Sequence, residues 1–165
     1  MKENLIIVTC KVPSEAYQIL SGVRQKPKRK WIKVSYGALV KRDAGKLSME
    51  DGFAADSEED EWALTGALIG GLLGLQAGAV GAMVAGGIGA LIGDSLGKKE
   101  MKGMTILLEK VSECLTDGEA ALLLLAKEKD ETTLAEKLGG FHVSIIRMDA
   151  EEIAVEIKRA KKENR

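Results

Sequence analysis

The chain has 165 residues and a formal net charge of -1, because 24 Lys and Arg stand against 25 Asp and Glu. A chain of this length can bury a core without disulfides, and its balanced charge excludes a protein that is basic all over its surface. Cys10 and Cys114 make neither a disulfide framework nor a metal-ligand spacing, and there is one histidine. We therefore predict a non-enzymatic protein with no cofactor and no metal.

The N-terminus does not have the pattern of a secretory signal. Lys2 is followed at once by Glu3, and the apolar run at residues 5–8 is shorter than the hydrophobic region of a signal peptide. We therefore expect the protein in the cytoplasm or at the cytoplasmic face of a membrane.

The first part of the chain predicts a β-α-β unit. Residues 5–9 are rich in β-branched side chains and predict a short buried strand. Pro13 opens a helix whose apolar face carries Ala16, Ile19, Leu20 and Val23. A basic stretch leads into a second strand at residues 31–40, where apolar and polar side chains alternate as in a half-exposed sheet.

The last part of the chain predicts a second β-α-β unit. Residues 121–126 contain four consecutive leucines after a turn at 116–118, which predicts a buried strand. Asp130 can cap a short helix carrying Leu134 and Leu138. A strand at 141–147 follows, and then a helix that begins at Asp149 and carries Ile153 and Ile157.

Together the two units predict an α+β protein, a ferredoxin-like sandwich in which a four-stranded sheet has its helices on one face. We expect the first β-α-β half and the start of an acidic linker at 1–55. The rest of that linker and a glycine-zipper helical hairpin occupy 56–97. An amphipathic connecting helix, with its apolar stripe from Met101 to Leu115, spans 98–118. The second half and a C-terminal helix complete the chain at 119–165.

Residues 63–93 contain no charged side chain, and 10 of these 31 residues are glycine. Small residues recur every four positions, which on a helix forms a groove that a second helix can enter. The members of the predicted zipper are Gly66, Gly70, Gly74, Gly78, Ala82, Gly86, Gly89 and Gly93. Either the segment is a hairpin buried within a soluble protein, or it meets a membrane or self-associates. A single membrane pass would separate the two β-α-β halves, so we expect a hairpin that enters and returns.

The chain resembles an uncharacterised prokaryotic family of predicted membrane proteins of unknown function. The resemblance is carried by the strand at 3–9, the segment at 37–43, the glycine-zipper stretch at 66–70 and the leucine strand at 118–125. It implies a ferredoxin-like domain with an inserted zipper and an association with membranes. It implies no catalytic residue.

Basic side chains cluster between the first helix and the second strand. Around Trp31 lie Arg24, Lys26, Lys28, Arg29, Lys30 and Lys33. The cluster is either a solvated loop or a surface for anionic lipid headgroups or an acidic partner. Nucleic acid is the least favoured partner, because one aromatic residue makes a poor base-stacking platform.

Other candidates for chemistry are weak. The stretch at 93–99 has three residues between its glycines, where a phosphate-binding loop has four, and it follows a predicted helix. His142 lies in a predicted strand and Cys10 at the end of another, both typical of structural positions.

The leading hypothesis is a membrane-associated homo-oligomer that assembles or inserts through the zipper hairpin, with itself and membrane lipid as partners. The alternative is a soluble self-assembling or small-ligand-binding module whose hairpin is buried between subunits. A third, weaker hypothesis is a ferredoxin-like enzyme with its site at a dimer cleft.

Overall fold

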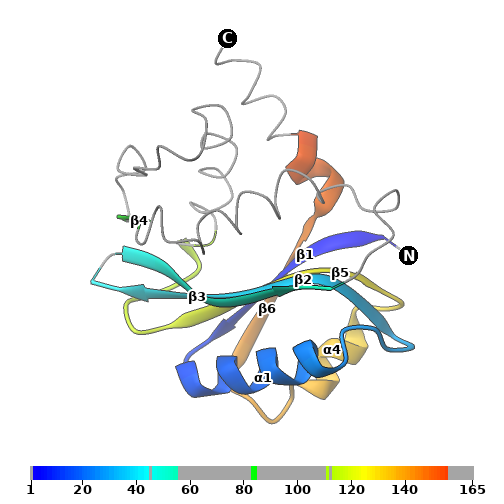
Figure 1. Cartoon of the computed structure of the whole chain (residues 1–165), viewed down its shortest axis with the longest axis horizontal. Helices are drawn as coiled ribbons and strands as arrows, with labels where there is room; N and C mark the ends of the chain where they lie inside the picture. Colours follow the sequence, from blue (N-terminus) through cyan, green and yellow to red (C-terminus); the bar gives the residue numbers. More distant parts are fainter. Residues whose placement is uncertain (1, 45, 56–82, 85–110, 112, 156–165) are drawn as a thin grey trace.

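The computed structural model describes residues 2–44, 46–55, 83–84, 111 and 113–155. They form an α+β structure around one antiparallel sheet with the strand order β4-β3-β2-β5-β1-β6 (Figure 1). The elements are β1 (Glu3–Cys10), α1 (Pro13–Gln25), β2 (Ile32–Asp43), β3 (Lys46–Ala54), β4 (Met83–Val84), β5 (Ala120–Glu128), α4 (Thr132–Lys137) and β6 (Val143–Asp149). Residues 150–155 are also helical. The predicted α+β class is confirmed.

The two strands predicted to be buried, β1 and β5, lie side by side in the interior of the sheet. β5 pairs with β1 on one side and with β2 on the other, and β1 also pairs with β6. All four leucines at 122–125 are fully buried. An interior strand has its backbone groups satisfied on both edges, so a continuous apolar run can occupy this position.

Helices α1 and α4 cover one face of the sheet (Figure 1). The predicted apolar face of α1 is confirmed, since Ala16, Ile19 and Leu20 are buried and Val23 packs against the same core. Leu134 and Leu138, predicted to anchor α4, belong to this core as well. On the sheet, Ile6, Val8, Leu122 and Leu124 complete it.

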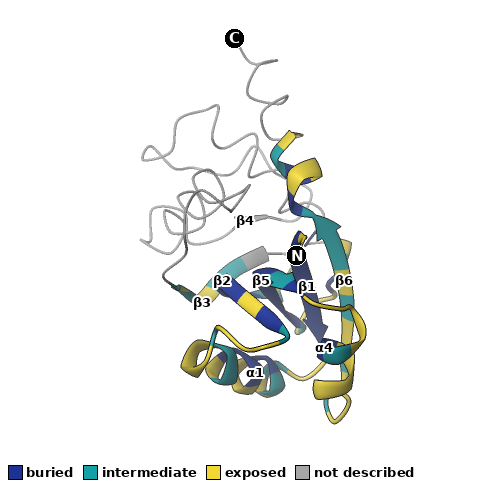
Figure 2. Cartoon of the chain, turned by 90° about the vertical axis from the view of Figure 1, so that its right-hand side faces the viewer, coloured by how far each residue is buried: buried dark blue, intermediate teal, exposed yellow. Residues whose placement is uncertain are grey.

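The opposite face of the sheet is buried too, as the dark blue strands in Figure 2 show. Leu5, Ile7, Tyr36, Leu123 and Leu125 on this face are each 0% exposed. The helical residues 150–155 lie on this side of the sheet, away from α1 and α4 (Figure 1). Apolar side chains are therefore buried on both faces of the sheet.

The half-exposed character predicted for the second strand is wrong. β2 runs on to Asp43 and is buried from Val34 to Val40. The pairing of β2 with β5 shifts register between Val34 and Tyr36, and there the Ser35 hydroxyl donates to the Leu125 carbonyl at 3.2 Å. Ser35 is buried because this bulge and its hydrogen bond accommodate a polar side chain inside the sheet.

β3 was not predicted, so the first half of the fold is larger than a β-α-β unit. It forms a hairpin with β2 through a turn in which Ala44 has a φ of 51°. Its sequence, KLSMEDGFA, mixes acidic, polar and glycine residues without an apolar alternation. A strand of this composition gives little signal, because it is placed by the pairing with its neighbour rather than by its own pattern.

The predicted caps of the two later helices are confirmed. The Asp130 carboxylate accepts hydrogen bonds from the backbone N–H of Thr132 at 3.0 Å and of Thr133 at 2.9 Å. The Asp149 carboxylate accepts from the N–H of Glu151 at 2.8 Å and of Glu152 at 3.2 Å. Each carboxylate satisfies donors that the first turn of a helix leaves unpaired.

Most of the predicted hairpin and connecting helix lies outside the described residues. Within the hairpin range, Met83–Val84 forms a strand that pairs with β3, so these two residues are not helical as predicted. Near the end of the connecting helix, residues 111 and 113 are helical, and a turn follows before Leu115. Leu115 is buried as expected, but it lies beyond the helix. Ile157 is outside the described residues.

Candidate functional site: a basic surface at one end of the sheet

The predicted basic cluster is held in a tight turn between α1 and β2. The Arg29 N–H donates to the Ile32 carbonyl at 2.7 Å, and the Val34 N–H donates to the Pro27 carbonyl at 2.8 Å. Lys28 and Lys33 form an antiparallel bridge across the turn. Backbone hydrogen bonds therefore fix the points from which these lysines project.

Trp31 anchors the turn to the rest of the fold. Its half-buried side chain packs against the core under α1 and α4, and its carbonyl accepts a hydrogen bond from the Lys129 N–H at 3.0 Å. Lys129 follows the end of β5 and is exposed. The structure thus brings a further lysine, remote in sequence, to the predicted cluster.

The two arginines of the predicted cluster have structural contacts. The Arg24 guanidinium lies 2.6 Å from Asp51 Oδ1, donates to the Gly52 carbonyl and stands 5.9 Å from the centre of the Phe53 ring. The Arg29 guanidinium donates to the Lys26 carbonyl at 3.3 Å and to the Gly22 carbonyl at 3.4 Å, at the end of α1. Arg24 therefore ties α1 to β3, and Arg29 caps the C-terminus of α1.

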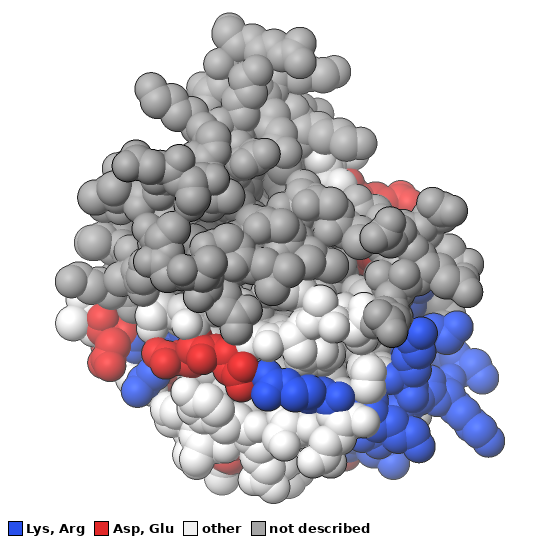
Figure 3. All heavy atoms as spheres, in the orientation of Figure 1, with Lys and Arg blue, Asp and Glu red and all other residues white. Residues whose placement is uncertain are grey.

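The lysines have no such contacts. Within the described part of the chain, no ion pair or side-chain hydrogen bond engages Lys26, Lys28, Lys30, Lys33 or Lys129, and all five are exposed. We call these five residues the basic surface. Figure 3 shows the Lys and Arg side chains gathered at the end of the molecule where β2 begins.

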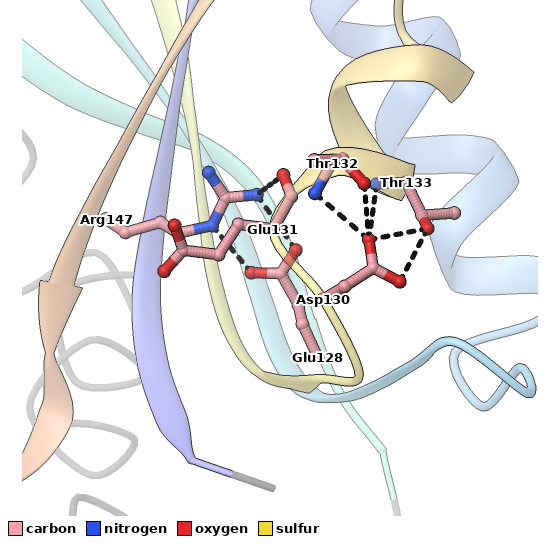
Figure 4. A network of polar contacts seen from close by, with 6 residues as sticks. All are labelled: Glu128, Asp130, Glu131, Thr132, Thr133 and Arg147. Carbon is pink, nitrogen blue, oxygen red and sulfur yellow. Dashed lines mark hydrogen bonds and ion pairs between the residues drawn. The ribbon is translucent and has the colours of Figure 1, made fainter.

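Two acidic residues next to the basic surface, Glu128 and Asp130, are satisfied by other partners (Figure 4). Glu128, whose side chain is 3% exposed, receives two hydrogen bonds from the Arg147 guanidinium, at 2.8 and 2.9 Å. Arg147 also donates to the Glu131 carbonyl at 2.9 Å. The side-chain hydrogen bond to Glu128 raises the pKa of Arg147.

Asp130 is satisfied within its own loop. The hydroxyls of Thr132 and Thr133 donate to its carboxylate at 2.8 Å, in addition to the two backbone N–H groups of the α4 cap. These bonds, led by the one from the Thr132 hydroxyl, lower the pKa of Asp130 to about 2. Glu128 and Asp130 are therefore engaged elsewhere, and neither pairs with the five lysines.

Sequence reasoning missed Lys129. A usable signal existed, because residues 127–129 alternate Lys, Glu and Lys directly after the buried leucines and so mark the end of a strand. The sequence did not show that the residues after β5 lie beside the start of β2. Only the pairing of β2 with β5, in which Lys33 lies opposite Lys127, brings the two basic segments together.

The predicted zipper residues, from Gly66 to Gly93, lie outside the described residues. The chain leaves the described sheet at Ala55, whose N–H donates to the Ser35 carbonyl at 2.9 Å. Ser35 is two positions along β2 from Lys33. The chain that leads through the acidic linker to the glycine-rich segment therefore leaves the described sheet close to Lys33.

The nucleophile and base candidates elsewhere have ordinary structural roles. Burial raises the pKa of the Cys10 thiol to about 11, so at neutral pH the thiol stays protonated, a form that is a poor nucleophile. His142 Nδ1 lies 3.0 Å from Glu15 Oε1, and the His142 N–H donates to the same carboxylate, which joins the start of α1 to the turn before β6. This pair holds two elements together.

The fold and the basic surface define an α+β protein whose antiparallel sheet carries, at one end, five exposed lysines without an ion-pair partner in the described part of the chain. Within the described residues, no helix is both long and apolar enough to cross a membrane. The family described as "Protein of unknown function (DUF1269)" matches residues 63–159, more than half of the chain, and the chain belongs to this family. Comparisons with the curated proteins and with the solved structures gave no significant match.

The matched region begins at the first residue of the uncharged segment and runs past β6 into the helical residues that follow. The resemblance noted in the sequence also included the first strand and residues 37–43, which this match does not cover. The family description names neither a glycine zipper nor a membrane.

Proposed function

We propose that this protein is a non-enzymatic, membrane-associated homo-oligomer that assembles or inserts through a glycine-zipper hairpin within residues 56–97. In this proposal, the basic surface contacts the headgroups of anionic lipids. The supporting observation is the set of five exposed lysines whose neighbouring acids are bound elsewhere. A polybasic surface close to a bilayer gains about 1 kcal/mol for each Lys or Arg near the anionic leaflet.

The place where the chain leaves the sheet supports the same proposal. Ala55 is bonded two positions from Lys33, so the acidic linker that leads to the proposed hairpin starts near these lysines. In this proposal, the hairpin enters the bilayer on the side of the protein that carries the basic surface, and apolar insertion and electrostatic attraction act together. Two such contributions together give stable membrane binding where one gives only marginal binding.

We also infer that the domain is a ferredoxin-like sandwich. The antiparallel order β6-β1-β5-β2 supports this arrangement, as does the presence of one helix between β1 and β2 and another between β5 and β6. In this interpretation β3 and β4 extend the sheet beyond β2.

Vesicle flotation tests the membrane proposal. We expect the full-length protein to float with vesicles that contain phosphatidylserine, and the Lys28→Gln/Lys30→Gln variant to bind these vesicles roughly 30-fold more weakly, since two lysines contribute about 2 kcal/mol. Lys11→Gln/Lys137→Gln is the matched control, because it removes the same charge from exposed positions outside the basic surface. The control should bind as the unmodified protein does.

The outcomes distinguish membrane association from the soluble alternative. If the protein stays at the bottom with both neutral and anionic vesicles, membrane association is wrong and the soluble self-assembling module is supported. If the control variant weakens binding as much as the test variant, the basic surface has no special role.

Nucleic acid is a weaker candidate partner, because Trp31 packs against the core instead of offering a free stacking face.

A second experiment tests the zipper. Gly70→Leu adds a large side chain to the predicted groove, and overpacking of this kind costs about 1–3 kcal/mol. We expect this variant to lose its assembly while the sheet domain stays folded, and Gly70→Ala to be milder because a methyl group often fits. Native mass measurement and circular dichroism on both variants give the result. Unchanged assembly in Gly70→Leu would mean that the glycine row is not an interface.

A further inference from the structure

The strand β6 forms an open edge of the sheet. It pairs with β1 along its whole length, and within the described residues no strand pairs with its other side. Figure 2 shows β6 in profile at the margin of the sheet. An edge strand presents a row of unpaired backbone N–H and C=O groups, which is a template for pairing with another chain.

The register shows which backbone groups point outward. The Lys11 N–H donates to the His142 carbonyl, so the backbone of His142 faces β1. In an antiparallel pair this direction alternates from one residue to the next. The N–H and C=O groups of Val143, Ile145, Arg147 and Asp149 therefore point away from the sheet.

The first four residues of β6 lack the features that usually protect an edge strand. Residues 143–146 contain no charge, no proline and no glycine, and Ile146, at the midpoint of β6, is 41% exposed. The pairing of β6 with β1 shows no register shift. The opposite margin of the sheet differs, because β4 pairs with the start of β3, β3 carries Glu50, Asp51 and Gly52, and its pairing with β2 is irregular.

We propose that β6 pairs antiparallel with β6 of a second copy of this chain, around a two-fold axis at Ile146. β6 has seven residues, so an axis at its midpoint uses the full length of the strand. This pairing places Ile146 directly opposite Ile146 of the second copy and removes its exposed surface from water. The result is one continuous sheet through two protomers.

The charges favour this register. With the axis at Ile146, Arg147 lies opposite Ile145 of the second copy, and Asp149 lies opposite Val143. No like charges face one another directly. An axis one residue further on would place Arg147 opposite its own copy, and like charges directly opposite are destabilising. Arg147 is also neutralised within its own protomer by Glu128.

This interface is formed by residues outside the glycine-rich segment and does not depend on the proposed function. Disulfide trapping tests it on the full-length chain. Cys10 is kept because it is buried, and Cys114 is replaced by Ser because its thiol is partly exposed. In this background, Ile146→Cys brings two Cα atoms to about 4.5 Å, which a disulfide can span. Ser144→Cys is the matched control, because its two copies would be about 13 Å apart along the strands.

We expect mild oxidation to cross-link Ile146→Cys and to leave Ser144→Cys uncross-linked. Cross-linking of Ser144→Cys alone would overturn the register, and no cross-linking of either variant would overturn the interface. Circular dichroism establishes that both variants are folded.

Light scattering gives a second test. Ile146→Lys places two positive charges against each other at the axis, and we expect the particle mass to fall by half. Tyr17→Lys, which changes another exposed apolar residue on α1, should leave the mass unchanged. Equal masses for Ile146→Lys and the unmodified protein would overturn the proposal. Failure of the zipper proposal is distinguishable, because Gly70→Leu would then leave the mass unchanged while Ile146→Lys still halves it.

Discussion

The charged side chains at the two ends of the sheet differ in whether they form ion pairs. At the end that holds the turn between β2 and β3, Arg42 lies 3.2 Å from Asp117, and its guanidinium also donates to the Leu115 carbonyl at 2.7 Å. Glu15 and His142 form a further pair at this end. At the other end, Glu128 is bound by Arg147, and Asp130 caps α4. The five lysines of the basic surface are exposed there without an ion-pair partner among the described residues.

This difference shows that the net charge of a chain does not describe how its charges are distributed. The whole chain is nearly neutral, yet five lysines at one end have no ion-pair partner among the described residues. Unpaired like charges in one place repel each other, so their retention costs stability unless an anion is bound. The opposite end shows the ordinary case, in which charged side chains close the loops of the fold.

The largest expected effect comes from breaking the pair that keeps Glu128 away from the lysines. Arg147→Ala leaves the Glu128 carboxylate, 3% exposed, without its two hydrogen bonds, and we expect a loss of about 3 kcal/mol in the free energy of unfolding. Urea denaturation measures this loss. Arg147→Lys is the control, and it should recover part of the stability because it restores the charge but not the two-pronged geometry. A loss below about 1 kcal/mol would contradict this role of the pair.

A smaller effect of opposite sign is expected at the basic surface itself. Lys33 lies opposite Lys127 in β5 and opposite Lys28 in the turn. Because like charges directly opposite destabilise a sheet, Lys33→Glu should stabilise the fold by about 0.2–1 kcal/mol while weakening binding to anionic vesicles. Lys33→Gln, which removes the charge without reversing it, should give an intermediate result in both urea denaturation and flotation. A destabilised Lys33→Glu variant would show that the lysine is structurally required.

The smallest expected effect is on the dependence of stability on acidic pH. The pKa of Asp130 is held at about 2, below its ordinary value of 3.8, chiefly by the hydrogen bond from the Thr132 hydroxyl. Since the folded-state pKa is the lower one, this contribution is fully present above pH 3.8 and is lost as the pH falls toward 2. Thermal melts between pH 6 and pH 2 should show a weaker acid dependence for Asp130→Asn than for the unmodified protein. Equal acid dependence would mean that Asp130 does not contribute.

Glu15, at the opposite end of the sheet, provides the matched comparison with Asp130. The side-chain hydrogen bond from His142 lowers the pKa of Glu15 from its ordinary value of 4.5, so Glu15 also stabilises the fold above that pH and loses its effect below it. Glu15→Gln should therefore reduce the acid dependence of the melting temperature, starting near pH 4.5. If only one of the two variants changes the melts, the two ends differ in acid response as well as in charge.

Much of the fold could be predicted from local patterns. The leucines of β5 and the apolar run of β1 indicated buried strands, because charged and turn residues bound these runs. Pro13, Asp130 and Asp149 indicated where helices begin, since each favours or satisfies the first turn of a helix. These signals act over a few residues and need no knowledge of the neighbours.

The sequence by itself determined which segments are apolar, where the first helical turns begin and which loop carries the lysines near Trp31. It did not determine β3, the burial of Ser35 or the presence of Lys129 beside that loop. Tertiary structure decided these features, because strand pairing joins residues that lie about 90 positions apart in the chain. A strand's own side chains do not specify its partner, so only the assembled sheet decides which charges become neighbours and which edge stays open.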